Sequence, residues 1–291
     1  MTTKFGIMTD SGADFSLKYK EQHNIILIPT RIMIDDVEYI DRENISREEI
    51  INKMINDKAK TSTSVAPPAE FHRIIEESLK KYEKILFISI SSKMSATYQN
   101  ALLTAKRINP DRFYALDTQS VSWGMTLLLN HAILRRDQGI EIEKVIEEIK
   151  QMMKSLKLYF IVDTLEYLRR GGRIGAAKSM IGQLIGAKPI LTIEDGEIKP
   201  ADTVRSLEAG IEYFENKLKK FTKEYTNYVF AAIYGIEHVD FKDFADNLVN
   251  KYRPLKFFYA PIGANIISHA GPFLFGIGIV EIPDDALMSY K

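Results

Sequence analysis

One strand of the buried type constrains the fold of this chain more than any other feature. Residues 84–90 read Lys-Ile-Leu-Phe-Ile-Ser-Ile, a nearly continuous apolar run. Such a run is typical of a parallel strand covered on both faces, because a strand with one solvated face would alternate. Apolar residues at helical spacing precede the run at 68–82 and follow it at 95–108, and a further strand is predicted at 113–116. This order of strands and helices predicts a parallel sheet with right-handed crossovers.

The remaining elements of the first half fit the same arrangement. Residues 5–8 and 25–33 each predict a strand, and residues 122–138 predict a helix. Ser46 begins another helix with a capping box, since Glu49 stands three residues later. In parallel α/β sheets, functional groups lie at the carboxyl ends of strands. Polar residues follow three predicted strands at such ends: Thr9-Asp10-Ser11, Ser91-Ser92 and Asp117-Thr118.

The second half predicts a mixed sheet. The turn Asp195-Gly196, between apolar runs at 190–193 and 197–198, indicates a hairpin. The other predicted elements are strands at 158–162, 228–234, 257–260 and 273–282, helices at 142–156 and 206–220, and a short helix with a glycine turn within 165–175. A chain of 291 residues exceeds what one hydrophobic core usually organises. We therefore expect two α/β domains, 1–156 and 157–291.

Composition excludes several classes of function. The chain has no cysteine, which rules out a disulfide scaffold, a thiolate metal site and a catalytic Cys. Lys plus Arg equal Asp plus Glu at 39 each, so nucleic acid is not expected as a main partner. No two of the five histidines have metal-ligand spacing, so no metal site is predicted. No signal-like or membrane-spanning apolar run is visible, and we expect a soluble, cytoplasmic protein.

Two hydroxyl-rich segments are candidate anion-binding sites. Thr61-Ser62-Thr63-Ser64 is a polar loop before the helix that starts near Pro68, and the segment 91–100, which contains Ser95, follows the buried strand. In each segment the hydroxyls either cap a helix or, together with free backbone N–H groups, bind a negative group. The segment 91–100 contains no glycine, so it is neither a phosphate loop nor a nucleophile elbow.

Two further segments carry groups that are either structural or functional. The arginines of 168–175 surround Gly171-Gly172 and suit phosphate, but a helix C-terminus with a glycine cap explains the same pattern. His269 lies in a segment, 261–272, that we predict to be a loop between two apolar strands. A lone histidine there is either a structural group or a functional one.

The order of several short motifs is more specific than any one of them. These motifs are Thr9-Asp10-Ser11; Thr63-Ser64 before Pro67; Ser95-Ala96-Thr97-Tyr98-Gln99; Asp163-Thr164-Leu165-Glu166-Tyr167-Leu168 followed by Gly171-Gly172-Arg173-Ile174; Lys188-Pro189-Ile190-Leu191; Val204-Arg205; and His269-Ala270-Gly271-Pro272. Taken together over essentially the whole chain, they resemble the DegV family of bacterial fatty-acid-binding proteins. That family includes the FakB carrier subunits of fatty acid kinase.

The resemblance implies a fold and a ligand. It implies an N-terminal domain with a parallel sheet between helices, a C-terminal domain with a mixed sheet and helices, and a tunnel between the domains. The tunnel holds a long-chain fatty acid, and no cofactor or metal is implied. The residues that match the family's carboxylate-binding positions are Thr63, Ser64, Ser95 and His269, and Arg173 and Arg205 match arginines that would contact the partner or a phosphate.

Two residues depart from the family pattern. Ala96 replaces a glycine after Ser95, and this is tolerable if the residue is already helical. Phe273 replaces the glycine that usually follows Gly271-Pro272. If that position needs a positive φ, Phe273 is strained, and we then expect the loop at His269 to be shifted.

The resemblance also implies what the protein does. It looks like a non-catalytic carrier that presents the fatty acid carboxylate to a dihydroxyacetone-kinase-like fatty acid kinase, which forms acyl phosphate for phospholipid synthesis. Lipid exchange would involve transient membrane contact. Burial of an acyl chain favours binding by about 0.8 kcal/mol per CH₂. A histidine beside the carboxylate is expected to be protonated, with its pKa raised by the neighbouring charge.

Two enzymatic alternatives stay open. One is a serine hydrolase that uses Ser95 and His269, although no glycines flank Ser95 and no acidic third member can be assigned. The other is a nucleotide- or phosphate-binding enzyme built on Arg170-Gly171-Gly172-Arg173, which lacks a known phosphate loop.

Overall fold

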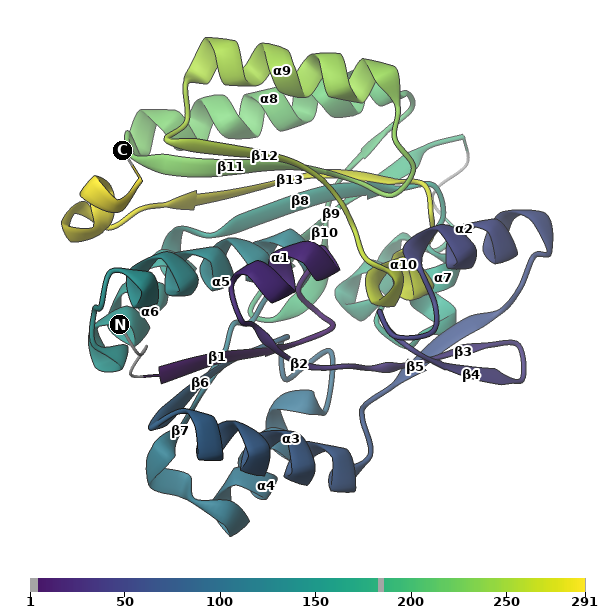
Figure 1. Ribbon diagram of the computed structural model, residues 1–291. Helices are drawn as coiled ribbons and strands as arrows, with labels where there is room; N and C mark the ends of the chain where they lie inside the picture. The colour runs from purple at the N-terminus through teal and green to yellow at the C-terminus, as the bar shows by residue number, and fades with distance from the viewer. Residues whose placement is uncertain (1–4, 183–185, 291) are drawn as a thin grey trace.

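The N-terminal sheet is parallel, as predicted. The structure, a computed structural model, describes residues 5–182 and 186–290 (Figure 1). The sheet has the strand order β2 (Ile26–Ile28), β1 (Phe5–Asp10), β6 (Lys84–Ser89) and β7 (Phe113–Asp117). Every residue of β1 is buried, and so are all but the first residue of β6. Both central strands are therefore covered on both faces, which explains their continuous apolar sequence.

Helices form layers on both sides of this sheet. On one side α3 (Pro68–Lys81) and α4 (Thr97–Ile108) pack, and on the other side lie α5 (Ser122–Asp137) and α6 (Ile142–Ser155) (Figure 1). A short 3-10 helix, η1 (Pro110–Arg112), leads into β7. Since α5 also packs against the second large sheet, it is apolar and buried around most of its circumference.

The C-terminal sheet has six strands and is mixed, again as predicted. Its order is β10 (Glu197–Val204), β9 (Lys188–Glu194), β8 (Lys157–Val162), β13 (Leu274–Glu281), β11 (Tyr228–Tyr234) and β12 (Lys256–Pro261). Only the β11–β12 pair is parallel among the described strands of this sheet. The outer face is covered by α8 (Leu207–Glu224) and α9 (Val239–Tyr252), and α5 and α6 lie between the two sheets (Figure 1).

A small antiparallel sheet corrects two predictions. It contains β4 (Val37–Ile40), β3 (Arg31–Ile34) and β5 (Thr61–Ser64), in that order. The single strand predicted at 25–33 is wrong: β2 and β3 belong to different sheets, and Pro29, which has no N–H to donate, lies between them. The prediction of a loop at 61–64 is also wrong, because this hydroxyl-rich segment pairs with β3 along its whole length.

Local signals located several elements correctly. Ser46 and Glu49 form the predicted capping box at the start of α2 (Arg47–Asn56), and Pro68 occupies the first turn of α3. The predicted hairpin joins β9 to β10 through Asp195 and Gly196, both with positive φ. The remaining short helices are α1 (Leu17–Gln22), α7 (Glu166–Arg170), η2 (Gly175–Met180) and η3 (Asp284–Ser289).

The segment 261–272 is not the predicted loop. It contains α10 (Ala264–Ala270), which begins after Gly263 and ends at Gly271, where φ is +82°. Gly263 is the N-cap and Gly271 the C-cap of this short helix. His269 therefore stands in the last turn of a helix.

Candidate functional site

A cavity of about 830 Å³, including its open mouth, lies where the two halves of the chain meet. The N-terminal half contributes the ends of β1, β5 and β6 and the turn at Ser95, and the C-terminal half contributes α7, α10 and the inner face of the six-stranded sheet. Apolar lining residues include Ile90, Val121, Leu158, Phe160, Leu168, Ile198, Ile233, Ile266 and Leu274. Apolar walls with a few convergent polar groups are typical of a small-molecule site.

Thr63 and His269 meet at the polar part of this cavity. Thr63 Oγ1 and His269 Nε2 are 2.7 Å apart and form a hydrogen bond. In β5, Thr61 and Thr63 are half-buried, whereas Ser62 and Ser64 are exposed, as expected for an alternating strand. Thr61 Oγ1 donates to Ser268 O at 2.9 Å, so both threonines fix β5 to α10. Ser64 lines the cavity from the exposed side of the strand.

The imidazole of His269 is closely packed, and one of its two nitrogens has no partner among the described residues. This nitrogen is the buried Nδ1 atom. A Cβ atom on Gly171 would overlap this nitrogen, so the glycine gives the ring its space. Burial lowers the pKa of His269 to about 4, and the nearby Arg173 guanidinium lowers it as well. The expected upward shift concerns a ring beside a bound carboxylate, and it stays a prediction.

Ser95 lies immediately before α4, as predicted. Its Oγ is 2.8 Å from Thr97 Oγ1 and accepts a hydrogen bond from Thr97 N at 3.3 Å. Ala96 is the N-cap residue of α4, and Ser95, one residue earlier, lines the cavity. Ala96 has φ −75° and ψ 1°, which an L-residue adopts without strain. The helical conformation that we set as the condition is not present, since Ala96 precedes α4, but its negative φ does not require glycine.

The two predicted arginines differ in position. Arg173 lines the cavity; its Nε donates to Met94 O at 3.1 Å and its Nη1 to Gly171 O at 2.5 Å. Arg205 is exposed before α8, does not line the cavity, and makes no hydrogen bond or ion pair with any residue the structure describes. The structure therefore brings Arg173, and not Arg205, to the other predicted site residues.

Phe273 does not distort the loop that follows α10. Its φ is not positive; the left-handed position is Gly271, where Tyr167 lies against the backbone. The condition for strain is therefore not met, and the side chain of Phe273 is 46% exposed. The next residue, Leu274, lines the cavity. Phe273, Phe275, Met180 and Ile181 do not line it.

Asp10 is a cavity residue whose role the sequence did not indicate. Its signals were its position at a strand end and its place in the motif Thr9-Asp10-Ser11. The carboxylate accepts hydrogen bonds from Gly12 N at 2.7 Å, Ile90 N at 3.0 Å and Ser89 Oγ at 3.0 Å. Burial raises its pKa to about 6, although these hydrogen bonds lower it. Because its oxygens are already engaged, Asp10 serves to tie the ends of β1 and β6 together.

The contacts in the site differ from those of a serine hydrolase. Within residues 5–182 and 186–290, no hydrogen bond joins Ser95 to His269 and no carboxylate is bonded to the imidazole. A nucleophilic serine needs a bonded base and a group that orients this base. The described part of the chain also contains no group of three or more His, Asp or Glu side chains that could hold a metal ion.

Known proteins match this chain over nearly its whole length. A model of the DegV family of uncharacterised proteins matches residues 4–281. The chain belongs to the DegV family. A DegV domain-containing protein of Caldanaerobacter subterraneus subsp. tengcongensis is 29% identical over 283 residues, which are 96% of this chain and 99% of that protein.

Solved structures of DegV proteins share the fold. A structure that describes fatty acid binding by a DegV family protein of Thermus thermophilus has a TM-score of 0.90 and 26% identity, and covers 96% of this chain and 100% of that chain. The fatty-acid-binding DegV of Bacillus subtilis has a TM-score of 0.85 and 25% identity, and covers 96% and 99%. The described helices of this DegV protein include none that is long and apolar enough to cross a membrane.

Proposed function

We propose that this DegV protein binds one long-chain fatty acid in the cavity between its two halves. The observation that carries the proposal is the Thr63–His269 contact at the polar part of an otherwise apolar cavity. Thr63, Ser64, Ser95 and His269 would bind the carboxylate, and the acyl chain would lie along the apolar walls. The fatty-acid-binding structures of similar DegV proteins support the same ligand class.

The physical chemistry of the site suits a carboxylate on an acyl chain. A buried carboxylate is costly unless it receives hydrogen bonds. Hydroxyl groups and the first N–H groups of α4 supply donors at one end, with Arg173 nearby as a cation. Each buried CH₂ contributes about 0.8 kcal/mol, so a long chain contributes on the order of 10 kcal/mol before the costs of binding.

We infer further that the protein is a carrier and not an enzyme. The partner would be a dihydroxyacetone-kinase-like fatty acid kinase, in which a carboxylate oxygen attacks the γ-phosphorus of ATP, giving acyl phosphate and ADP. The product would feed phospholipid synthesis in the cytoplasm, with transient membrane contact during lipid exchange. The lack of a Ser95–His269 hydrogen bond among the described residues supports this role over the hydrolase. The position of Arg173 leaves it as a contact for the head group, and exposed Arg205 as a contact for the partner or a phosphate.

We also propose that residues 1–156 and 157–291 are the two domains. The parallel sheet lies entirely before this boundary, and the described strands of the six-stranded sheet all lie after it. A boundary between α6 and β8 would place α5 and α6 with the N-terminal domain, where they cover the parallel sheet and pack onto the other domain.

Mass spectrometry of an organic extract tests the ligand. We expect a fatty acid in roughly equal amount to the purified protein, because burial of the acyl chain makes dissociation slow. Extracts without any fatty acid, together with no uptake of added palmitate or oleate, would refute the proposal.

Activity-based labelling tests the carrier role. The delipidated protein is treated with a fluorophosphonate probe and with p-nitrophenyl esters. We expect neither labelling nor turnover, and acyl phosphate only after a kinase and ATP are added. Labelling of Ser95 that is lost in His269→Ala, with ester turnover lost in parallel, would establish the hydrolase instead.

A further inference from the structure

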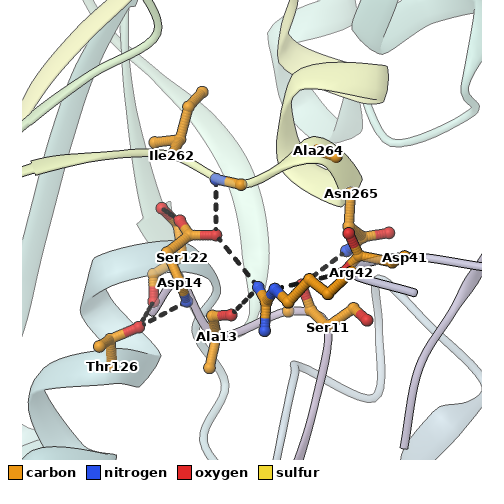
Figure 2. Close-up of polar contacts among 12 residues, drawn as sticks. Ser11, Ala13, Asp14, Asp41, Arg42, Ser122, Thr126, Ile262, Ala264 and Asn265 are labelled. Carbon is orange, nitrogen blue, oxygen red and sulfur yellow. Dashed lines mark hydrogen bonds and ion pairs between the residues drawn. The ribbon is translucent and has the colours of Figure 1, made fainter. Parts of the chain in front are cut away.

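Helix α10 is tied to the N-terminal half of the chain at both ends. At its start, Asp14 Oδ1 accepts a hydrogen bond from the N–H of Gly263, the N-cap residue, at 2.8 Å (Figure 2). One residue into the helix, Asn265 Nδ2 donates to Ser11 O at 3.2 Å. At its last turn, His269 meets Thr63. The helix that carries His269 therefore takes its position from groups of the opposite half.

Asp14 is the charged member of these ties and is held by several partners. The residue is 2% exposed. Ser122 Oγ donates to Asp14 Oδ2 at 2.5 Å, and the Asp14 N–H donates to Thr126 Oγ1 at 2.8 Å (Figure 2). Arg42 lies with Nη2 4.0 Å from Asp14 Oδ1 and donates to Ala13 O at 2.6 Å. A hydrogen bond to a carboxylate is stronger than one to a neutral acceptor, so Asp14 is the firmest of the ties at this end.

Two of the partners of Asp14 have an unfavourable backbone conformation. The φ angles of Arg42 and Ser122 are +63° and +56°, in the left-handed region that residues other than glycine rarely adopt. This conformation costs free energy, so it persists only where contacts with the surrounding structure enforce it. Residues in such conformations cluster at functional sites. Both residues direct polar atoms to the same carboxylate (Figure 2).

The cluster also separates two spaces in the protein. Ser122 and Asn265 line the cavity described above. Asp14, Arg42 and Gly263 line a groove on the other side, of about 1,340 Å³ including open space. The Asp14 cluster, defined here as Asp14, Arg42 and Ser122, thus forms part of the wall between the fatty-acid cavity and this groove.

We propose that Asp14 is a positioning residue for the carboxylate site, which it affects through α10 and His269. The helix has seven residues, so it is a rigid element about 10 Å long, and a displacement of its first turn moves its last turn. Asp14 itself does not line the cavity. The proposal rests on the proposed function, because it assumes that His269 contacts the carboxylate.

The test compares an acid and an alcohol of the same chain length. We expect Asp14→Asn to raise the Kd for palmitate at least about tenfold, and to change the Kd for hexadecanol less than about twofold. A loss of general stability would weaken both ligands alike, so the ratio of the two Kd values reports positioning. Arg42→Gln keeps the Asp14 carboxylate, and residue 42 lies outside the cavity. This variant should shift the ratio of the two Kd values in the same direction by a smaller factor.

A matched control removes a buried carboxylate elsewhere. Glu148 is 1% exposed, and the hydrogen bonds of its carboxylate go to Arg135 and His131 and not to α10. Glu148→Gln should lower the unfolding temperature without changing the ratio. If Asp14→Asn does not fold, Arg42→Gln alone decides the outcome.

The possible results separate this inference from the function on which it rests. Wild-type protein that binds neither palmitate nor hexadecanol would refute the proposed function. A second result would overturn the positioning role alone. In that case Thr63→Val loses the preference for palmitate over hexadecanol, but folded Asp14→Asn and Arg42→Gln keep the wild-type preference. Equal weakening of acid and alcohol in Asp14→Asn would also overturn it.

Discussion

Thr63 Oγ1 and His269 Nε2 lie 2.7 Å apart, although 206 positions of sequence separate them. Thr63 comes from a strand of the small N-terminal sheet, and His269 comes from the last turn of the helix that connects β12 to β13 of the C-terminal sheet. Each brings one polar group to a cavity that both halves line. The candidate head-group site therefore exists only when the two halves are packed together.

Removal of one hydroxyl should weaken the acid selectively. A hydrogen bond to a charged acceptor contributes about 1.5–3 kcal/mol, so Thr63→Val and Ser95→Ala should each raise the Kd for palmitate roughly 10- to 150-fold. Binding of hexadecanol should hardly change. Titration of the delipidated variants by calorimetry measures both ligands. If acid and alcohol lose affinity equally, these residues shape the cavity and do not bind the carboxylate.

Alanine substitution of the adjacent residues Gly171 and Gly172 should have different effects, the first on palmitate affinity and the second on stability. Gly171 has φ −71°, which alanine adopts, but the added Cβ would overlap His269 Nδ1. Gly171→Ala should therefore displace the ring and lower palmitate affinity about as much as Thr63→Val does.

Gly172 is the matched control for that substitution. A Cβ there meets no atom within 4 Å, but its φ of +70° strains an alanine. Gly172→Ala should cost about 1 kcal/mol of stability and leave the affinity unchanged. Equilibrium unfolding and palmitate titration on both variants separate the two effects. Equal affinities for the two variants would contradict the role of Gly171.

Local sequence signals were sufficient for much of the fold. The apolar run at 84–90 became β6 in the centre of a parallel sheet, and Asp195-Gly196 became the turn of a hairpin. The capping box at Ser46 and the proline in the first turn of α3 also formed as predicted. In each case the residues that decide the structure are neighbours in sequence.

Other elements depend on contacts that the sequence does not reveal. The hydroxyl-rich residues of β5 have no apolar pattern, and they form a strand because β3 supplies its hydrogen-bond partners. Helix α10 is too short to be stable alone. Asp14 and Thr61 of the N-terminal half hydrogen-bond to it, and its own Asn265 hydrogen-bonds back to that half. For the same reason the grouping of Thr63, Ser95 and His269 was expected only from family resemblance. The Asp14–Gly263 contact, across 249 positions, was not expected at all.

The neutral state of His269 predicts a pH dependence of stability. In the folded protein its pKa is lowered to about 4, whereas in the unfolded chain the ring takes up a proton near its ordinary pKa of 6.5. As pH falls from 7 to 5, the unfolded chain is protonated first, so the free energy of unfolding falls. The contribution of His269 to this fall is about 2 kcal/mol.

The variant His269→Gln isolates that contribution. Asp10 and Asp14, whose pKa values are raised to about 6, act in the opposite direction, since their protonation at low pH favours the folded state. Both carboxyl groups are present in the two proteins, so the difference in pH dependence belongs to His269. Urea unfolding of ligand-free protein at pH 7 and pH 5 measures it. An identical pH dependence for wild type and variant would show that the folded ring titrates normally.

Removal of the fatty acid should lower the thermal stability. A ligand that binds only the folded state stabilises it by RT ln(1 + [L]/Kd), about 2.7 kcal/mol at a free concentration of 100 Kd. We expect the delipidated protein to unfold at lower temperature, and added palmitate to restore the original midpoint. Thr63→Val should need a higher palmitate concentration for the same restoration. A midpoint that does not respond to palmitate would contradict binding to the folded state.

The course of the acyl chain is open to a test on the inner face of the C-terminal sheet. Ile233 on β11 is 1% exposed and lines the cavity. Ile233→Phe adds volume there, and if the tail lies along this face, the bound acids should shift to shorter chains. Each CH₂ that no longer fits costs about 0.8 kcal/mol, a factor of about four in affinity. Mass spectrometry of the extracted acids gives the chain-length distribution directly.

Ile161→Phe is the matched control, because Ile161 is equally buried but packs on the outer face of the same sheet with Phe214 and Phe230. Both substitutions overpack a core and should cost about 1–3 kcal/mol of stability, so a shift in chain length that appears only in Ile233→Phe reports the tail. An unchanged distribution in a folded Ile233→Phe would place the tail along the other walls of the cavity.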